Sequence, residues 1–133
     1  MVNSHTVIFS HELKGIWFTA NYRLDKWEKA RRVKQARRIS WAKFHACPQY
    51  DKATLTVKVI NRTARRFDPL NAADIIKPLI DGAIDAGILP DDDEKHLIST
   101  TIIGGREKGK PSHELIFTFT KIENETLIEG EQK

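Results

Sequence analysis

The sequence has 133 residues and a formal net charge of +4, with 40% hydrophobic and 30% charged residues, a mixture that excludes a disordered chain and fits one domain. Its single cysteine, Cys47, excludes an intrachain disulfide and a cysteine-rich zinc site, and no apolar run approaches the ~18 residues of a membrane span. We therefore expect a single domain over residues 1–133, located in the cytoplasm, with neither an export signal nor a membrane segment.

The first third of the chain predicts a strand and a long helix. Residues 6–10 (TVIFS) are a short apolar run typical of a strand, and residues 25–46 are rich in Lys, Arg, Glu and Ala and lack Gly and Pro, which predicts a helix. One side of this helix is expected to face the core through Trp27, Ala30, Val33, Trp41 and Phe44. A neighbouring stripe is basic and comprises Arg31, Lys34 and Arg38. Such a stripe is typical of a solvated helix face as well as of a nucleic acid contact.

The middle of the chain predicts a second strand and a second helix. Residues 53–60 (ATLTVKVI) alternate apolar and polar side chains, the period of a half-buried strand. The segment that follows has an apolar helical face comprising Ile76, Leu79, Ile80, Ala83 and Ile84. The opposite face is charged and comprises Asp74, Lys77, Asp81 and Asp85. Pro78 leaves two alternatives, a helix that begins near Lys77 or one that is kinked, and Gly87 is expected to end it.

The last third predicts two more strands. Residues 96–103 (HLISTTII) and 113–120 (HELIFTFT) have β character, and we interpret residues 104–112 (GGREKGKPS) as a hairpin loop between them. Residues 123–133 are polar and acidic and are expected to fray. The order β-α-β-α-β-β predicts an α+β fold, a mixed sheet of about four strands with two main helices packed on it.

Acidic residues are concentrated at two places within this basic chain. They occur at 68–74 and at 91–94, and the helix between them could return the chain to the same edge of the sheet. Clustered carboxylates would suit Mg²⁺, or Mn²⁺ in its place, because these cations prefer oxygen ligands. Basic segments at 26–38, 61–67 and 105–110 flank the acids, as expected for a metal-dependent nuclease that binds phosphodiester backbones. The simpler alternative is that the acids are solvated turn residues.

The segment that contains both groups of acidic residues also carries a motif. Residues 65–97 (RRFDPLNAADIIKPLIDGAIDAGILPDDDEKHL) resemble the core motif of the RusA-type Holliday junction resolvases. Residues 19–38 (TANYRLDKWEKARRVKQARR) resemble the N-terminal region of phage and prophage members. The resemblance implies a homodimeric, Mg²⁺-dependent endodeoxyribonuclease that resolves four-way DNA junctions by paired nicks in recombination and repair.

The resemblance also implies roles for single residues. It makes Asp68 a catalytic metal ligand, Lys77 the catalytic lysine and Asp81 the acid of the same helix. It also matches Asp91 and Asp92 to a pair of metal-binding aspartates, of which Asp92 is the expected catalytic ligand. The family has a second aspartate two residues after the first and four before the lysine, a position that is Leu70 when counted from Asp68 or Ala73 when counted from Lys77. The candidates to replace it as a metal ligand are Asp74 and Asp93.

Branched DNA is the expected partner, and neither a membrane nor a small-molecule substrate is expected. The candidate DNA contacts are Arg31, Lys34, Arg38, Arg62, Arg65, Arg66, Lys108 and Lys110. The competing hypothesis is a protein that binds junctions without cutting them, because its catalytic site has decayed at Leu70.

Overall fold

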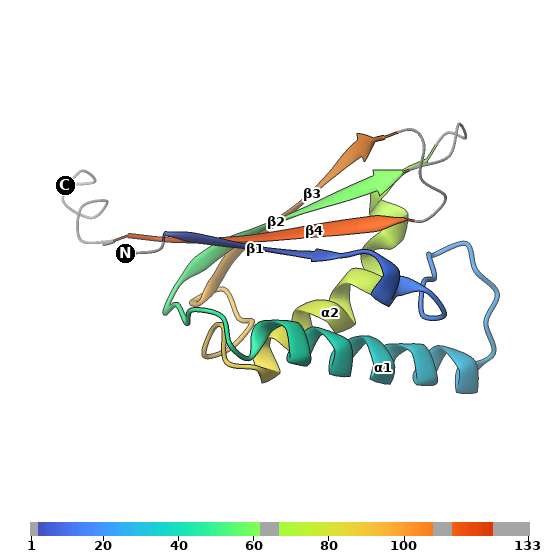
Figure 1. Ribbon diagram of the computed structural model, residues 1–133, viewed down its shortest axis with the longest axis horizontal. Coiled ribbons are helices and arrows are strands. Elements are labelled where there is room, and N and C mark those ends of the chain that lie inside the picture. Colours follow the sequence, from blue (N-terminus) through green and yellow to red (C-terminus); the bar gives the residue numbers. More distant parts are fainter. Residues whose placement is uncertain (1–2, 62–66, 108–112, 124–133) are drawn as a thin grey trace.

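Four strands form one mixed β-sheet in the computed structural model, which describes residues 3–61, 67–107 and 113–123. The strands are β1 (Ser4–Phe9), β2 (Ala53–Asn61), β3 (Leu97–Arg106) and β4 (Glu114–Lys121). Their order across the sheet is β1-β4-β2-β3 (Figure 1). β4 is antiparallel to both β1 and β2, whereas β2 and β3 are parallel. The predicted α+β fold and its element order are confirmed.

The predicted hairpin between the last two strands was wrong. β2 lies between β3 and β4 in the sheet, so the two strands are not neighbours. The helix between β2 and β3 makes a crossover that places β3 parallel to β2, and β4 then pairs on the other side of β2. Part of the expected loop is strand, because Gly104, Gly105 and Arg106 belong to β3, and residues 108–112 lie outside the described residues.

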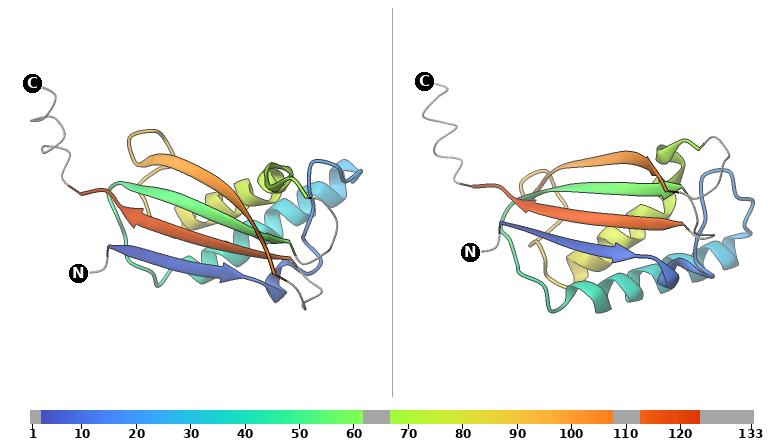
Figure 2. Two further views of the ribbon diagram at one scale, coloured as in Figure 1. Left: turned by 90° about the horizontal axis from the view of Figure 1, so that it is seen from above. Right: turned by 45° about the horizontal axis from the view of Figure 1, so that its top comes forward.

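Two α-helices, α1 (Lys26–Phe44) and α2 (Ala73–Asp85), cover one face of the sheet (Figures 1 and 2). Two short 3-10 helices, η1 (His11–Leu13) and η2 (Pro69–Ala72), precede them. α2 begins at Ala73, so Pro78 lies in its interior and not at its first position. Pro78 has no N–H, so the carbonyl of Asp74, four residues earlier, lacks its usual hydrogen-bond partner in the helix. Asp74 is exposed in the first turn of α2, so water can replace this bond.

The core stripe predicted for α1 was wrong for its two tryptophans. Trp27 is 75% exposed and Trp41 is 47% exposed. Ala30 is exposed too, whereas Phe44 is buried and Val33 is half-buried, as expected. The fully buried positions of α1 are Ala36, Ser40 and Phe44. α1 packs closely on α2, so its contact face needs small side chains, and the tryptophans lie outside it.

The core lies between the sheet and the helices. It contains alternate residues of β2, a Phe9–Phe117 pair with ring centroids 5.2 Å apart, and Ile75, Ile76 and Leu79 of α2. The apolar face predicted for α2 is therefore confirmed, apart from Ile84, which is half-buried. Among the described helices, none combines the length and the apolar character needed to cross a membrane.

Candidate functional site

Lys77 lies between two aspartates on the exposed side of α2. Its Nζ is 2.8 Å from Oδ1 of Asp81 and 2.9 Å from Oδ2 of Asp92. Asp81 follows Lys77 by one helical turn, so the first contact is local, whereas Asp92 arrives from the loop after α2. The hydrogen bonds that Lys77 donates to Asp81 and then to Asp92 raise the pKa of Lys77, and the same contact lowers the pKa of Asp92. The site therefore holds a protonated amine beside an ionised carboxylate.

This ion-pair cluster borders a cavity between α2 and β3. The cavity has a volume of about 270 Å³. It is lined by Ala73, Ile76, Lys77, Ile80, Asp92, Leu97, Thr100 and Ile102. Lys77 and Asp92 are its charged members, and the other walls are mainly apolar. A ligand entering here would meet both a cation and a carboxylate.

The acidic run itself is organised by backbone hydrogen bonds. Oδ1 of Asp91 accepts from the N–H of Asp92 at 2.7 Å, and Oδ1 of Asp93 accepts from the N–H of Lys95 at 3.1 Å. The carbonyl of Asp93 accepts from the N–H groups of His96 and Leu97. These bonds turn the chain into β3, and Asp92 is the residue of the run that reaches Lys77.

Asp68 lies at the start of η2. Its Oδ1 accepts from the N–H of Leu70 at 3.0 Å, so its carboxylate caps the 3-10 helix. Leu70 is 64% exposed, and Asp74 is exposed in the first turn of α2. Within residues 3–61, 67–107 and 113–123, no three or more His, Cys, Asp or Glu side chains form a group that could hold a metal ion. The structure thus brings Lys77 together with Asp81 and Asp92, and does not gather the expected ligands into one such group.

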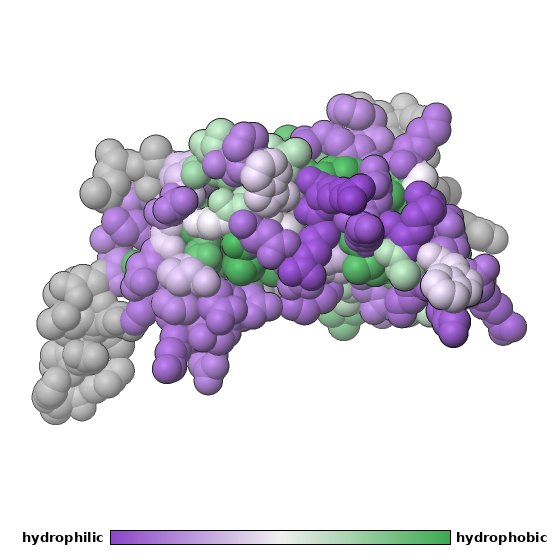
Figure 3. Space-filling model, turned by 90° about the horizontal axis from the view of Figure 1, so that it is seen from below, coloured by the Kyte–Doolittle hydropathy of each residue, from purple (hydrophilic) through white to green (hydrophobic). Residues whose placement is uncertain are grey.

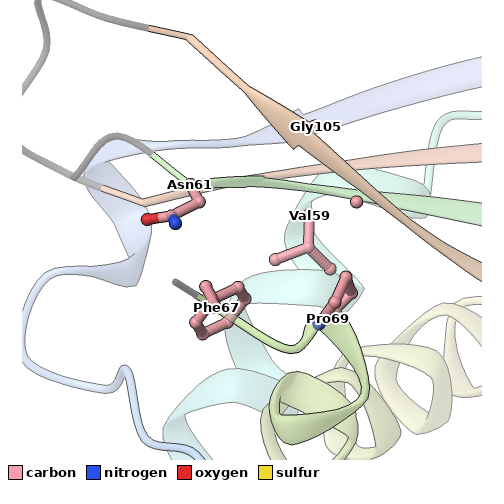
Figure 4. A pocket seen from close by; sticks show the side chains of 6 residues that line it. Val59, Asn61, Phe67, Pro69 and Gly105 are labelled. Atoms are coloured by element: carbon pink, nitrogen blue, oxygen red, sulfur yellow. The ribbon is translucent and has the colours of Figure 1, made fainter. Parts of the chain in front are cut away.

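A second cavity, also about 270 Å³, lies beside η2 and was missed by the sequence reasoning. Figure 4 shows Val59 and Asn61 of β2 on one side of it and Phe67 and Pro69 on the other. Gly104 completes the wall and lets η2 approach β3, because an added Cβ would lie 2.7 Å from Cγ of Pro69. The available signal was the Gly-Gly pair near the end of a β-strand.

The candidate DNA contacts are only partly described by the structure. Arg31 binds the carboxylate of Glu28 through Nε at 2.9 Å and through Nη2 at 2.7 Å, and it also bonds the carbonyl of Gly15. Lys34 and Arg38 are exposed on α1. Figure 3 views the molecule from the helix side, where hydrophilic side chains surround smaller apolar patches. Arg62, Arg65, Arg66, Lys108 and Lys110 lie outside the described residues.

Comparison with known proteins gives no family assignment. No family model matches the sequence, and no curated protein matches it either. The functional interpretation therefore depends on the motif in residues 65–97 and on the geometry around Lys77.

Proposed function

We propose that the protein is a metal-dependent endonuclease that resolves four-way DNA junctions by paired hydrolysis of phosphodiester bonds. The observation that supports this most directly is the Lys77 amine between Asp81 and Asp92 at the border of a cavity. A fixed cation beside an accessible carboxylate suits a substrate whose reacting group is an anion. The surrounding basic residues would bind the rest of the DNA backbone.

In this proposal Lys77 stabilises negative charge on the phosphate or on the leaving oxygen. Its side chain is 60% exposed, so a phosphate can approach it, and the raised pKa keeps it protonated at neutral pH. Asp81, whose side chain is 25% exposed, orients the amine from one turn along α2. Lys77 therefore needs no rearrangement of the helix to meet the substrate.

The carboxylates fit a magnesium ion in their chemistry. Mg²⁺ usually takes one or two protein carboxylates, and water and phosphate oxygens complete its shell. Asp92 and its neighbour Asp91 could supply such a pair, with Asp68 and either Asp74 or Asp93 as further candidates. When bound, the ion would polarise a phosphoryl oxygen and lower the pKa of the attacking water. A homodimer would place two such sites on the two strands of one junction.

The experiment compares Asp92→Asn and Asp68→Asn with the unmodified protein on synthetic four-way junctions with Mg²⁺. We expect each substitution to lower the cleavage rate at least about 100-fold while junction binding is retained, because a phosphoryl-transfer site depends on its charged groups. Glu94→Gln is the matched control, since Glu94 is an exposed acid of the same run. Unmodified cleavage rates in both aspartate variants would refute the proposal.

A second candidate function is junction binding without cleavage. Two observations favour it: Leu70 stands at the position of the family's second aspartate, and Asp91 and Asp93 accept backbone hydrogen bonds. Titration with Mn²⁺ in a calorimeter separates the two functions. Saturable binding that is lost in Asp92→Asn supports the nuclease, whereas no binding and no cutting, with retained salt-dependent junction binding, supports the second function.

A further inference from the structure

A third cavity lies at the end of the molecule where residues 10–25 connect β1 to α1. Its volume is about 640 Å³, which falls within the range typical of small-molecule sites. Lys14, Trp17 and Tyr22 of the connecting segment line it, together with Arg32 of α1 and His113 before β4. It shares no lining residue with the cavity beside Lys77.

One wall of this cavity is aromatic. The rings of Trp17 and His113 are stacked, with centroids 4.1 Å apart and an interplanar angle of 10°. Burial lowers the pKa of His113, so the imidazole is neutral at neutral pH. Tyr22 is 47% exposed and offers its ring to a ligand. Flat aromatic surfaces of this kind bind other flat rings by stacking.

The other wall is cationic. Nε of Arg32 donates to the carboxylate of Glu28 at 2.7 Å, and Nη1 donates to the carbonyl of Trp17. These two bonds fix the guanidinium, which is 20% exposed, and use two of its five N–H donors. Lys14 is exposed at the same cavity, and no Asp or Glu occurs among the described residues that line it. Glu28 offsets part of the charge of Arg32, so the exposed Lys14 provides much of the attraction for an anion.

The connecting segment is also tied to η2, the element that begins after Asp68. The N–H of Ala20 donates to the carbonyl of Asn71 at 3.0 Å. The ring of Phe67 lies 6.1 Å from that of His113, measured between centroids. The connecting segment therefore lies at the same end of the molecule as η2, as the ribbon in Figure 1 shows.

We propose that this cavity binds one nucleotide of a single-stranded polynucleotide, with its base on the aromatic wall and its phosphate on Lys14 and Arg32. A nucleotide combines a flat ring with an anion, which is the combination that the two walls offer. Stacking on aromatic side chains tolerates any base, so the site selects single-stranded character over sequence. Binding here needs no metal and no cleavage, and it is separate from the chemistry proposed at Lys77.

The experiment uses a tryptophan as a local probe. The chain has three tryptophans, and Trp27 and Trp41 are exposed, so Trp27→Phe with Trp41→Phe leaves Trp17 as the single fluorophore. This background is titrated, without metal, with a ten-residue thymidine oligonucleotide, its uridine counterpart, and thymidine monophosphate. We expect saturable quenching of Trp17 by an oligonucleotide.

Two variants in that background locate the ligand. Tyr22→Ser and Lys14→Gln should each weaken oligonucleotide binding about tenfold, because a base stack or a phosphate contact is lost. Lys29→Gln removes the same charge from an exposed position of α1 that does not line the cavity, and should leave the affinity nearly unchanged. Circular dichroism confirms that each variant is folded.

Each outcome decides the inference. Tighter binding of the uridine oligomer would support the site and assign it to RNA, and tight binding of the monophosphate alone would overturn the polynucleotide assignment. No quenching, or unchanged affinity in both cavity variants, would overturn the inference altogether. Asp92→Asn should bind the oligonucleotide normally, so a failed cleavage assay and a failed quenching assay test different sites.

Discussion

Replacing Gly82 by alanine tests how the contact between the two helices determines the stability of the fold. Gly82 faces α1 at Ser40, and an added Cβ would lie 2.7 Å from Cβ of Ser40 and would overlap the carbonyl oxygen of Arg37. Carbon atoms in contact are normally about 3.5–4.0 Å apart, so the helices would have to separate. A backbone carbonyl cannot rotate away as a flexible side chain can.

The expected loss in free energy of unfolding is about 2 kcal/mol. Overpacking of a buried contact costs about 1–3 kcal/mol. Separation of the helices would also weaken the hydrogen bond from Oγ of Ser40 to the carbonyl of Leu79, worth about 1 kcal/mol. Alanine has a higher helix propensity than glycine, which returns about 1 kcal/mol. The steric and hydrogen-bond losses therefore outweigh the gain in propensity.

Urea unfolding followed by circular dichroism measures this change. For a domain of this size a loss of about 2 kcal/mol also lowers the melting temperature by roughly 5–10 °C. Adding Ser40→Gly to Gly82→Ala should restore little stability, because the overlap with the carbonyl of Arg37 remains. An unchanged or higher unfolding midpoint for Gly82→Ala would refute the reasoning, since it would mean that the helices can separate at no cost.

Three further predictions concern a helix cap, a half-buried histidine and a surface ion pair. Asp25→Ala should reduce the free energy of unfolding by about 1 kcal/mol in urea, because its carboxylate accepts from the N–H of Glu28 at 2.8 Å and caps α1. Burial lowers the pKa of His113 from 6.5, so its imidazole binds a proton more readily in the unfolded chain than in the folded one. The free energy of unfolding should therefore fall as the pH drops below 6.5. His113→Gln should reduce that fall between pH 7.5 and 5.5. A fall of the same size in that variant would contradict the assignment. Arg37→Ala should cost less than about 1 kcal/mol, since its ion pair with Asp85 is half exposed, and thermal melting in low and high salt checks this.

Local sequence patterns predicted the helices and strands better than they predicted which strands pair in the sheet. The alternation in residues 53–60 depends only on neighbouring side chains, and it gave β2 within one residue of its bounds. The glycine stop after α2 is equally local, and Gly87 has a φ of +94°, which favours glycine. The hairpin was wrong because sequence adjacency favoured pairing β3 with β4, whereas the crossover through α2 placed β3 on the far side of β2.

The contact face of α1 could not be predicted from hydrophobicity. The buried residues Ala36 and Ser40 are small, and neither is strongly apolar, whereas Trp27 and Trp41 dominate any hydrophobic pattern. What decides the face is the close approach of α2 at Gly82, and that depends on tertiary packing.

The local contact of the candidate site could be predicted from the sequence, but its contacts between distant segments could not. Lys77 and Asp81 are one helical turn apart, so their contact follows from the sequence once the helix is recognised. The contact of Asp92 with the same amine depends on how the loop after α2 folds back, which the sequence does not reveal. The third cavity joins Trp17, Arg32 and His113 from three separate segments, and no local pattern connects them.

The position of β4 has a consequence for synthesis of the protein. β4 is the last of the described strands along the sequence, yet it lies in the interior of the sheet between β1 and β2, with Thr6 opposite Thr118 and Leu55 opposite Phe119. While the nascent chain emerges from the ribosome, β1 has no neighbour in the sheet until residues 114–121 are available. β2, α2 and β3 can associate earlier, but the core keeps an open side where Phe117 and Phe119 will pack. Closure of the sheet is therefore a late event, and a ribosome that stalls shortly before β4 would present exposed apolar strand edges to chaperones and proteases.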